Sequence, residues 1–148
     1  MRFTKMHGLG NDFIIFDAPA GGPPDAETIR RLADRYTGIG FDQALMLEPP
    51  RREGTVAYYR IFNADGREVE QCGNGARCIA RYLHEKKTGA KSPELVLDSP
   101  GGMIHAKMSG DQVSVAMGVP DFAPATLPFA ASGEAYVYPL TVGESEVE

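Results

Sequence analysis

Around its first cysteine the chain reads Glu70-Gln71-Cys72-Gly73-Asn74-Gly75-Ala76-Arg77. A thiol stands immediately before two closely spaced glycines, and a helical pattern of apolar residues begins directly after it. The free N–H groups in the first turn of a helix favour negative charge. A cysteine held there is biased towards thiolate, the form that acts as a base or nucleophile, and the same N–H groups can hold a substrate carboxylate. The segment therefore predicts a helix that begins beside a reactive sulfur and an anion site.

The residues after Gly75 predict a helix over residues 75–87, which we expect to stop before Gly89. Its apolar stripe consists of Ala76, Ile79, Ala80 and Leu83. Cys78 lies near this stripe, and we expect it to be a small buried core residue. Six residues separate the two cysteines, which places them about 240° apart around the helix axis. A disulfide between them is not expected.

The rest of the chain predicts one further helix and a set of short strands. Asp25 can cap a helix that runs to about Tyr36, with Tyr36 on its apolar face. The predicted strands are two within residues 3–17, separated by the turn at residues 8–11, and others at 43–47, 55–63, 67–70, 95–97, 103–108 and 112–117, with a weak one at 135–138. The pattern predicts an α+β fold in which a strongly bent mixed or antiparallel sheet wraps around a central helix, the one that carries Cys72 at its mouth.

The bulk properties limit the classes of function. The chain has 148 residues, of which 43% are hydrophobic, which suits one domain with a real core. The net charge is −5 and no basic stripe is present, so nucleic acid is not an expected partner. No export signal or membrane-spanning run is visible, so we expect a cytoplasmic protein with free thiols. Two Cys and three scattered His residues also lack the spacing of zinc ligands.

Three amide side chains stand beside glycine-rich turns, where contacts to small molecules are often made. They are Asn11 after Gly8-Leu9-Gly10, Gln43 after Gly38-Ile39-Gly40-Phe41-Asp42, and Asn63 before Ala64-Asp65-Gly66. Amides are neutral and directional, which suits them to fixing an ammonium or carboxylate group. Taken singly, each is ambiguous, because Asn beside Gly is first of all a turn former. Asp42 and Asp65 are expected to shape turns.

Taken together, these segments resemble diaminopimelate epimerase from Met1 to about Phe122. The resemblance rests on Met6-His7-Gly8-Leu9-Gly10-Asn11-Asp12-Phe13, Gly38-Ile39-Gly40-Phe41-Asp42-Gln43, Asn63-Ala64-Asp65-Gly66, Cys72-Gly73-Asn74-Gly75-Ala76-Arg77-Cys78 and Met117-Gly118-Val119-Pro120-Asp121-Phe122. It implies one of the two pseudo-symmetric domains of that fold, with residues 1–122 as the amino-terminal domain and residues 123–148 as a segment that connects to a second domain.

The resemblance also implies a reaction. The family interconverts LL- and meso-diaminopimelate, on the route to lysine and peptidoglycan, without pyridoxal phosphate or metal, and a full-length member is expected to be a homodimer. Two cysteines act on opposite faces of the substrate Cα, and Cys72 matches one of them. By the same resemblance, Asn11, Gln43 and Asn63 match substrate contacts, and Gly73 and Asn74 match the segment that receives the α-carboxylate.

The second cysteine of the family lies in the second domain, which this sequence does not include. Cys78 cannot replace it, because Cys78 is turned away from Cys72 on the same helix. We therefore expect this chain to be an amino-terminal half of an epimerase, inactive on its own.

Two other readings remain open at this point. Proline racemases, hydroxyproline epimerases and phenazine-biosynthesis isomerases are related two-domain proteins with different chemistry. The isomerases do not use the cysteine pair, and the segments at residues 6–13 and 38–43 fit diaminopimelate epimerase better than the racemases. Alternatively, the chain is a non-catalytic binding module in which Cys72 is a structural thiol.

Overall fold

The computed structural model describes the chain except for residues 1, 87–91, 127–132, 134, 144 and 148. The chain forms two compact units, Met1–Met117 and Gly118–Glu148. The domain boundary expected near residue 122 stays a prediction. Among the described residues, no helix is long and apolar enough to cross a membrane.

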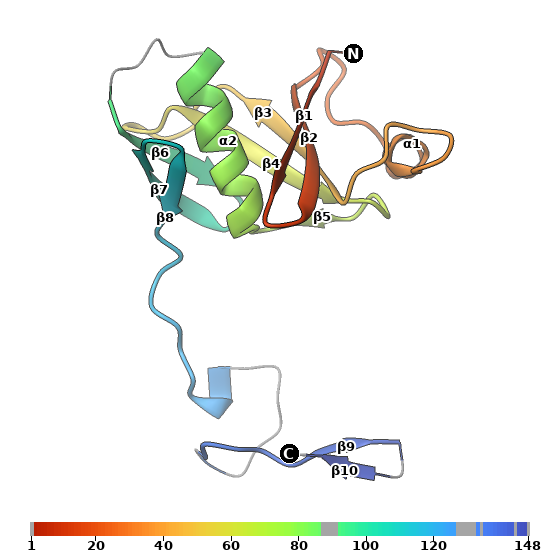
Figure 1. Cartoon of the computed structure of the whole chain (residues 1–148), viewed down its shortest axis with the longest axis vertical. Coiled ribbons are helices and arrows are strands. Elements are labelled where there is room, and N and C mark those ends of the chain that lie inside the picture. The colour runs from red at the N-terminus through yellow and green to blue at the C-terminus, as the bar shows by residue number, and fades with distance from the viewer. Residues whose placement is uncertain (1, 87–91, 127–132, 134, 144, 148) are drawn as a thin grey trace. The chain divides into compact units, whose positions relative to one another are not determined.

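The first unit is built on one curled, mixed sheet (Figure 1). The strands along it follow the order β1 (Thr4–Gly8), β2 (Asn11–Asp17), β3 (Gln43–Glu48), β4 (Ala57–Asn63), β6 (Glu94–Ser99), β7 (Gly102–Ser109) and β8 (Gln112–Val115), with the short β5 (Glu68–Val69) paired to β4. The pairs β2–β3 and β4–β6 are parallel, and the other pairs in this sheet are antiparallel.

The central helix of this unit is α2 (Gly73–Lys86), and it contacts both ends of the sheet. It packs against β1, β2 and β3 on one side and against β6, β7 and β8 on the other (Figure 1). A single helix can contact both edge strands only because the sheet bends around it. The predicted fold class is therefore confirmed.

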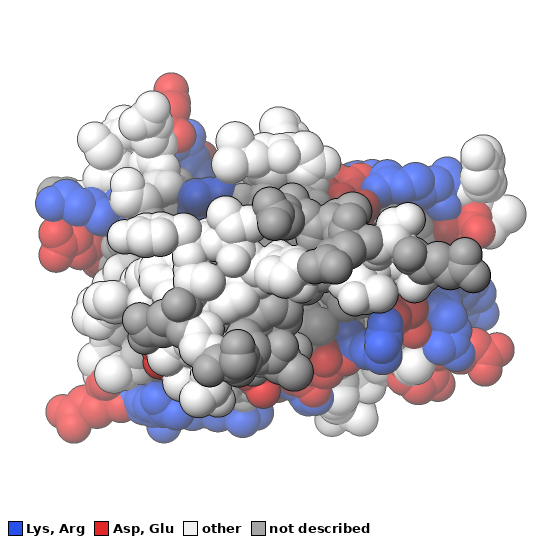
Figure 2. Space-filling model, turned by 90° about the horizontal axis from the view of Figure 1, so that it is seen from below, with Lys and Arg blue, Asp and Glu red and all other residues white. Residues whose placement is uncertain are grey.

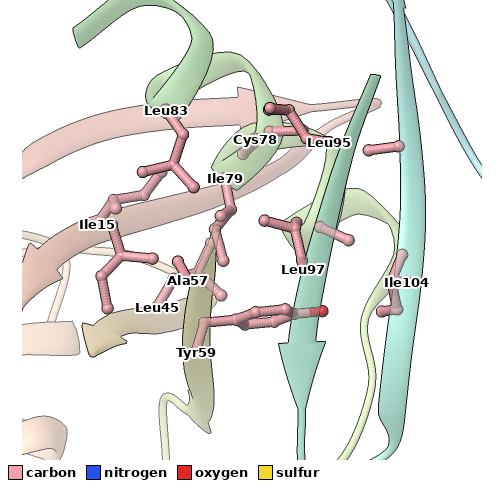
Figure 3. Packing of buried hydrophobic residues seen from close by; sticks show 14 of the residues in the cluster. Ile15, Leu45, Ala57, Tyr59, Cys78, Ile79, Leu83, Leu95, Leu97 and Ile104 are labelled. Carbon is pink, nitrogen blue, oxygen red and sulfur yellow. The ribbon is translucent and has the colours of Figure 1, made fainter. Parts of the chain in front are cut away.

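Two hydrophobic clusters lie on opposite faces of the sheet. Successive side chains of a strand point to opposite faces, so Phe13 and Ile15 face α2 while Ile14 and Phe16 belong to the cluster with α1 (Ala26–Ala33). In Figure 3, Ile79 and Leu83 of α2 point toward the sheet residues of the first cluster. Burial on both faces explains why residues 13–16 form a continuous apolar run, as the sequence predicted.

The helix α1 begins as expected and ends earlier than expected. The Asp25 carboxylate accepts from the Thr28 N–H at 2.7 Å, which caps the first turn. The last helical residue is Ala33, and the predicted end at Tyr36 is wrong. The Asp34 carboxylate accepts from the N–H groups of Tyr36 and Thr37 at 2.9 and 2.6 Å, and these bonds draw the chain into a turn. Tyr36 is consequently 97% exposed and does not lie on an apolar face.

The other boundaries depart from prediction in smaller ways. The helix expected at 75–87 begins at Gly73, and its expected end at residues 87 and 89 lies outside the described residues. The last strand of the sheet ends at Val115 and not at residue 117.

The weak strand predicted at residues 135–138 is not a strand, because no neighbouring strand pairs with it among the described residues. The second unit instead contains a short 3₁₀ helix (Pro124–Thr126) and an antiparallel pair, β9 (Leu140–Val142) with β10 (Ser145–Val147).

Charged side chains of both signs lie next to one another on the face shown in Figure 2. Among the described residues in that view, no broad area of positive charge is present. This mixed pattern agrees with the acidic composition.

A clamp formed by Asp12, Arg35 and Asp42 holds the parallel strands β2 and β3 together where both begin. The N–H of Asp12 donates to the Asp42 carboxylate, and the N–H of Asp42 donates to the Asp12 carboxylate, both at 3.0 Å. The Arg35 guanidinium donates to both Asp12 carboxylate oxygens at 3.0 and 2.8 Å and to Asp42 at 2.8 Å. Hydrogen bonds from Arg35, and further ones from Asp42 and Lys5, hold the pKa of Asp12 well below its usual range.

The clamp predicts how stability responds to the variant Asp12→Asn. Asn keeps the size of the side chain but loses the charge-assisted bonds to Arg35, so we expect the free energy of unfolding at pH 7 to fall by about 1–2 kcal/mol. Folding lowers the pKa of Asp12. The contribution of the Asp12 carboxylate to the free energy of unfolding is therefore fully present above its pKa in the unfolded chain, about 4, and is lost progressively as the pH falls below that pKa. Urea unfolding at a series of pH values should therefore show a difference from the wild type that shrinks below about pH 4.

The matched control is Asp111→Asn, since the Asp111 side chain is 99% exposed and has one long ion pair to Arg81. This variant should change stability by less than about 0.5 kcal/mol. Equal effects of the two variants at pH 7 would contradict the role given to the clamp.

Candidate functional site

Cys72 lies at the mouth of α2, directly before its first residue. The N–H of Gly75 points at the Cys72 sulfur, with 3.4 Å between nitrogen and Sγ, and the Cys72 carbonyl accepts from the Ala76 N–H at 2.9 Å. The side chain is half-buried, and the first turn of α2 contains no acidic residue. The positive end of the helix dipole is therefore left for the sulfur and for any anion that binds beside it.

Two glycines keep this helix start open to close approach. A Cβ on Gly75 would lie 3.2 Å from Cδ2 of Leu45 on β3, which is tighter than ordinary packing. A Cβ on Gly73 would lie 3.2 Å from the sulfur of Met117. Gly75 thus lets the first turn of α2 sit directly on the sheet, and Gly73 makes room for Met117.

The predicted residues Asn11 and Asn74 are brought together at this mouth. The Asn74 Nδ2 donates to Oδ1 of Asn11 at 2.7 Å, across 63 residues of sequence. Arg77, one turn further along α2, donates to Oδ1 of Asn74. The turn between β1 and β2 is therefore tied to the start of α2 through two amides.

The other two predicted amides, Gln43 and Asn63, form a second pair. They lie directly opposite each other in the register of β3 and β4, and Nε2 of Gln43 donates to Oδ1 of Asn63 at 2.8 Å. Asp42 joins the two pairs, because its carboxylate accepts from Nδ2 of Asn11 at 3.4 Å and its carbonyl accepts from the Ala64 N–H at 3.0 Å. The starts of β2 and β3 and the end of β4 thus meet at one edge of the sheet.

The turn after Asn63 is held rigidly. The Asp65 carboxylate accepts from the Arg67 N–H at 2.9 Å, and the Gly66 N–H donates to the Asn63 carbonyl at 2.8 Å. Gly66 has a φ of 86°, and a Cβ there would lie 2.6 Å from Cα of Ala26, so only glycine fits. Asp65 therefore shapes a turn, as expected. The Asp42 carboxylate instead bonds to Asn11, Asp12 and Arg35, which lie in other segments.

Cys78 is a core residue, as the sequence predicted. Its side chain is 4% exposed within the cluster between α2 and the sheet. Burial, with a smaller contribution from a negative charge on Cys72, raises the pKa of the Cys78 thiol to about 11. The two cysteines thus differ in burial: Cys72 is half-buried at the helix mouth and packs against the hydrophobic cluster in which Cys78 is buried.

Sequence reasoning did not single out Asp12, Arg35 or Arg77, although all three hold the site residues in place. For Arg77 a signal exists, since it lies three residues after Asn74 on a predicted helix, a spacing at which side chains meet. For Arg35 no local signal exists, because its partner Asp12 is 23 residues away. Among the described residues, no group of three His, Cys, Asp or Glu side chains is arranged to hold a metal ion.

Comparison with known proteins gives matches along the whole chain. A family model described as diaminopimelate epimerase matches residues 3–123. The diaminopimelate epimerase of Nitrosomonas europaea is 50% identical over 149 residues, which cover 100% of this chain and 54% of that protein. The diaminopimelate epimerase of Azoarcus is 47% identical, covering 99% of this chain and 53% of that protein. The chain thus spans about half the length of the curated relatives it matches.

Solved structures share the fold at low sequence identity. A probable proline racemase from Agrobacterium radiobacter matches with a TM-score of 0.58 and 19% identity, covering 78% of this chain and 41% of that one. A hydroxyproline epimerase from Agrobacterium vitis matches with a TM-score of 0.58 and 15% identity, covering 78% of this chain and 40% of that one. At these identities the likeness extends to the fold alone.

The contrast between the two cysteines predicts selective alkylation. At pH 8 we expect iodoacetamide to modify Cys72 at least about a hundredfold faster than Cys78, because burial and a pKa of about 11 keep Cys78 a protonated thiol. Peptide mass spectrometry over a time course measures both rates in one sample.

Denatured chain is the control, because unfolding should make the two rates equal. A native Cys72 that reacts as slowly as Cys78 would support the reading of Cys72 as a structural thiol.

Proposed function

The chain belongs to the diaminopimelate epimerase family, and from this premise we propose that it supplies one half of a two-base active site that interconverts LL- and meso-diaminopimelate. The observation that carries the proposal is Cys72, whose sulfur meets the Gly75 N–H at the mouth of α2. The identity of 50% to a diaminopimelate epimerase, against 19% to a probable proline racemase, supports diaminopimelate as the substrate over proline.

In this proposal, Cys72 exchanges a proton with the substrate Cα on one face. As a thiolate it takes the α-proton, which leaves the electron pair on Cα and makes Cys72 a neutral thiol. A second thiol, from the part of the family proteins that this chain does not match, delivers a proton to the opposite face and becomes a thiolate. In the reverse direction the two thiols exchange roles, so no net proton is gained or lost.

The backbone at the start of α2 would hold the substrate carboxylate. The N–H groups of Gly73 and Asn74 have no partner within the helix at these positions, and they lie beside Cys72. An α-proton is very weakly acidic, and oriented N–H dipoles on the carboxylate stabilise the negative charge that develops when it leaves. In this proposal, the anion site and the base would share one turn of the helix.

The four amides would then fix the remaining polar groups of the substrate. Asn11, Gln43 and Asn63 present neutral donors and acceptors at one edge of the sheet, and Asn74 joins them from α2. Neutral groups lose less hydration free energy than charged groups when a site closes over an amino acid. The cytoplasmic location and the homodimer expected from the sequence stay predictions.

The proposal is tested with a hybrid in which this chain replaces the matching part of the Nitrosomonas europaea relative. We expect the hybrid to incorporate solvent deuterium at Cα of LL-diaminopimelate and to form the meso isomer, as followed by NMR and chiral chromatography. Cys72→Ala should reduce the turnover rate by at least about a thousandfold, because the base on one face is removed.

Cys78→Ala is the matched control, and it should keep activity within about threefold at a temperature where the variant is folded. The 148-residue chain on its own should show no turnover. Turnover by the isolated chain, or an active Cys72→Ala hybrid, would contradict the proposal.

A further inference from the structure

Four side chains form a continuous line of hydrogen bonds across the mouth of α2. Arg77 donates to Oδ1 of Asn74, and Nδ2 of Asn74 donates to Oδ1 of Asn11 at 2.7 Å. Nδ2 of Asn11 in turn faces the Asp42 carboxylate at 3.4 Å. The line thus begins at a cation on α2 and ends at an anion on the loop before β3.

The chemistry of the two ends leaves one orientation for each amide between them. A guanidinium only donates, so the oxygen of Asn74 must face Arg77 and its NH₂ must face Asn11. The oxygen of Asn11 then accepts from Asn74, and its NH₂ faces Asp42, which only accepts when it is ionised. Reversing the Asn74 amide would set its NH₂ against the guanidinium and lose both bonds.

We propose that Arg77 is a positioning residue that fixes, through Asn74, which ends of the Asn74 and Asn11 amides are presented to the substrate; this rests on the function proposed above. The 3.4 Å separation at the Asp42 end makes a weak bond, so the stronger constraint comes from Arg77. Each amide NH₂ gives one hydrogen to the line, and its other hydrogen meets no acceptor among the residues that the structure describes. The orientation therefore leaves N–H donors available to an anionic group beside Cys72.

A purely structural role for Arg77 would be a side-chain pair that stabilises α2. Such a pair, three residues apart, contributes to helix stability without any effect on ligand binding. Arg81, one turn further along α2, has that role, since it pairs with Glu85 on the same helix and with Asp111 beyond it. Arg81→Met therefore removes the same charge from the same helix and is the matched control for Arg77→Met.

The first test is NMR of the ¹⁵N-labelled 148-residue chain. In Arg77→Met we expect the side-chain NH₂ resonances of Asn74 and Asn11 to shift and to exchange with solvent roughly tenfold faster, which corresponds to loss of one net hydrogen bond. Arg81→Met should leave both pairs of resonances unchanged. Arg77→Lys keeps a donor-only cation and should restore part of the protection.

Backbone spectra of each variant show whether it is folded, and Arg77→Lys still tests the orientation if Arg77→Met is not. Unchanged NH₂ resonances of Asn74 and Asn11 in Arg77→Met would overturn the proposal.

The second test uses the active hybrid, with diaminopimelate as the ligand. Misplaced amides should weaken substrate binding more than they slow proton transfer. Arg77→Met should therefore raise KM roughly tenfold with a smaller change in kcat. Arg81→Met should leave both constants unchanged. A shift in the NH₂ resonances without a change in KM would overturn the role toward substrate. A parent hybrid that is inactive would contradict the proposed function alone, since the NMR result stands independently of turnover.

Discussion

The reciprocal bonds between Asp12 and Asp42 are the constraint on which the geometry of the site depends. Strands β2 and β3 are parallel, so no tight turn fixes their register, and 25 residues lie between them in the chain. Each aspartate instead accepts the backbone N–H of the other, which pins the first residues of the two strands side by side. Asn11 directly precedes Asp12 and Gln43 directly follows Asp42. The bonds between the two aspartates therefore fix where these two amides lie.

The strength of this constraint comes from charge-assisted hydrogen bonds held in one geometry. Arg35 is half exposed, and exposed ion pairs contribute little to stability in water. Its guanidinium nevertheless binds both carboxylates at once, which keeps two like charges side by side in the orientation that the backbone N–H groups require. The Asp42 carbonyl also accepts from the N–H of Ala64, which follows Asn63 at the end of β4. The position of Asp42 therefore also constrains the end of β4.

Local sequence pattern predicted the parts of the fold that local physics controls. The apolar run at residues 13–16 is buried on both faces of the sheet, and the stripe after Gly75 became the inner face of α2, with Cys78 in the core. The end of α1 was missed because the Asp34 side chain competes for backbone N–H groups that a longer helix would have used. The hydrogen bonds from Arg35 to Asp12 and from Asn74 to Asn11 join segments that are distant in the sequence. Periodicity and spacing within one segment therefore cannot predict them.

Under the proposed function, the arrangement of the two cysteines would let this fold supply one face of a two-base site. Inversion at a stereocentre needs a proton donor and a proton acceptor on opposite sides of the same carbon. A helix start can present a single thiol to its open end, and Cys72 occupies that position. Cys78, the other cysteine in the chain, follows six residues later, about 240° further round the helix axis, and lies in the core, where burial raises its pKa to about 11. Moving it to the mouth would require turning α2 and exposing the core that the sheet wraps around. Under the proposed function, a second helix mouth facing the first across the substrate would meet the requirement without disturbing the core of this unit.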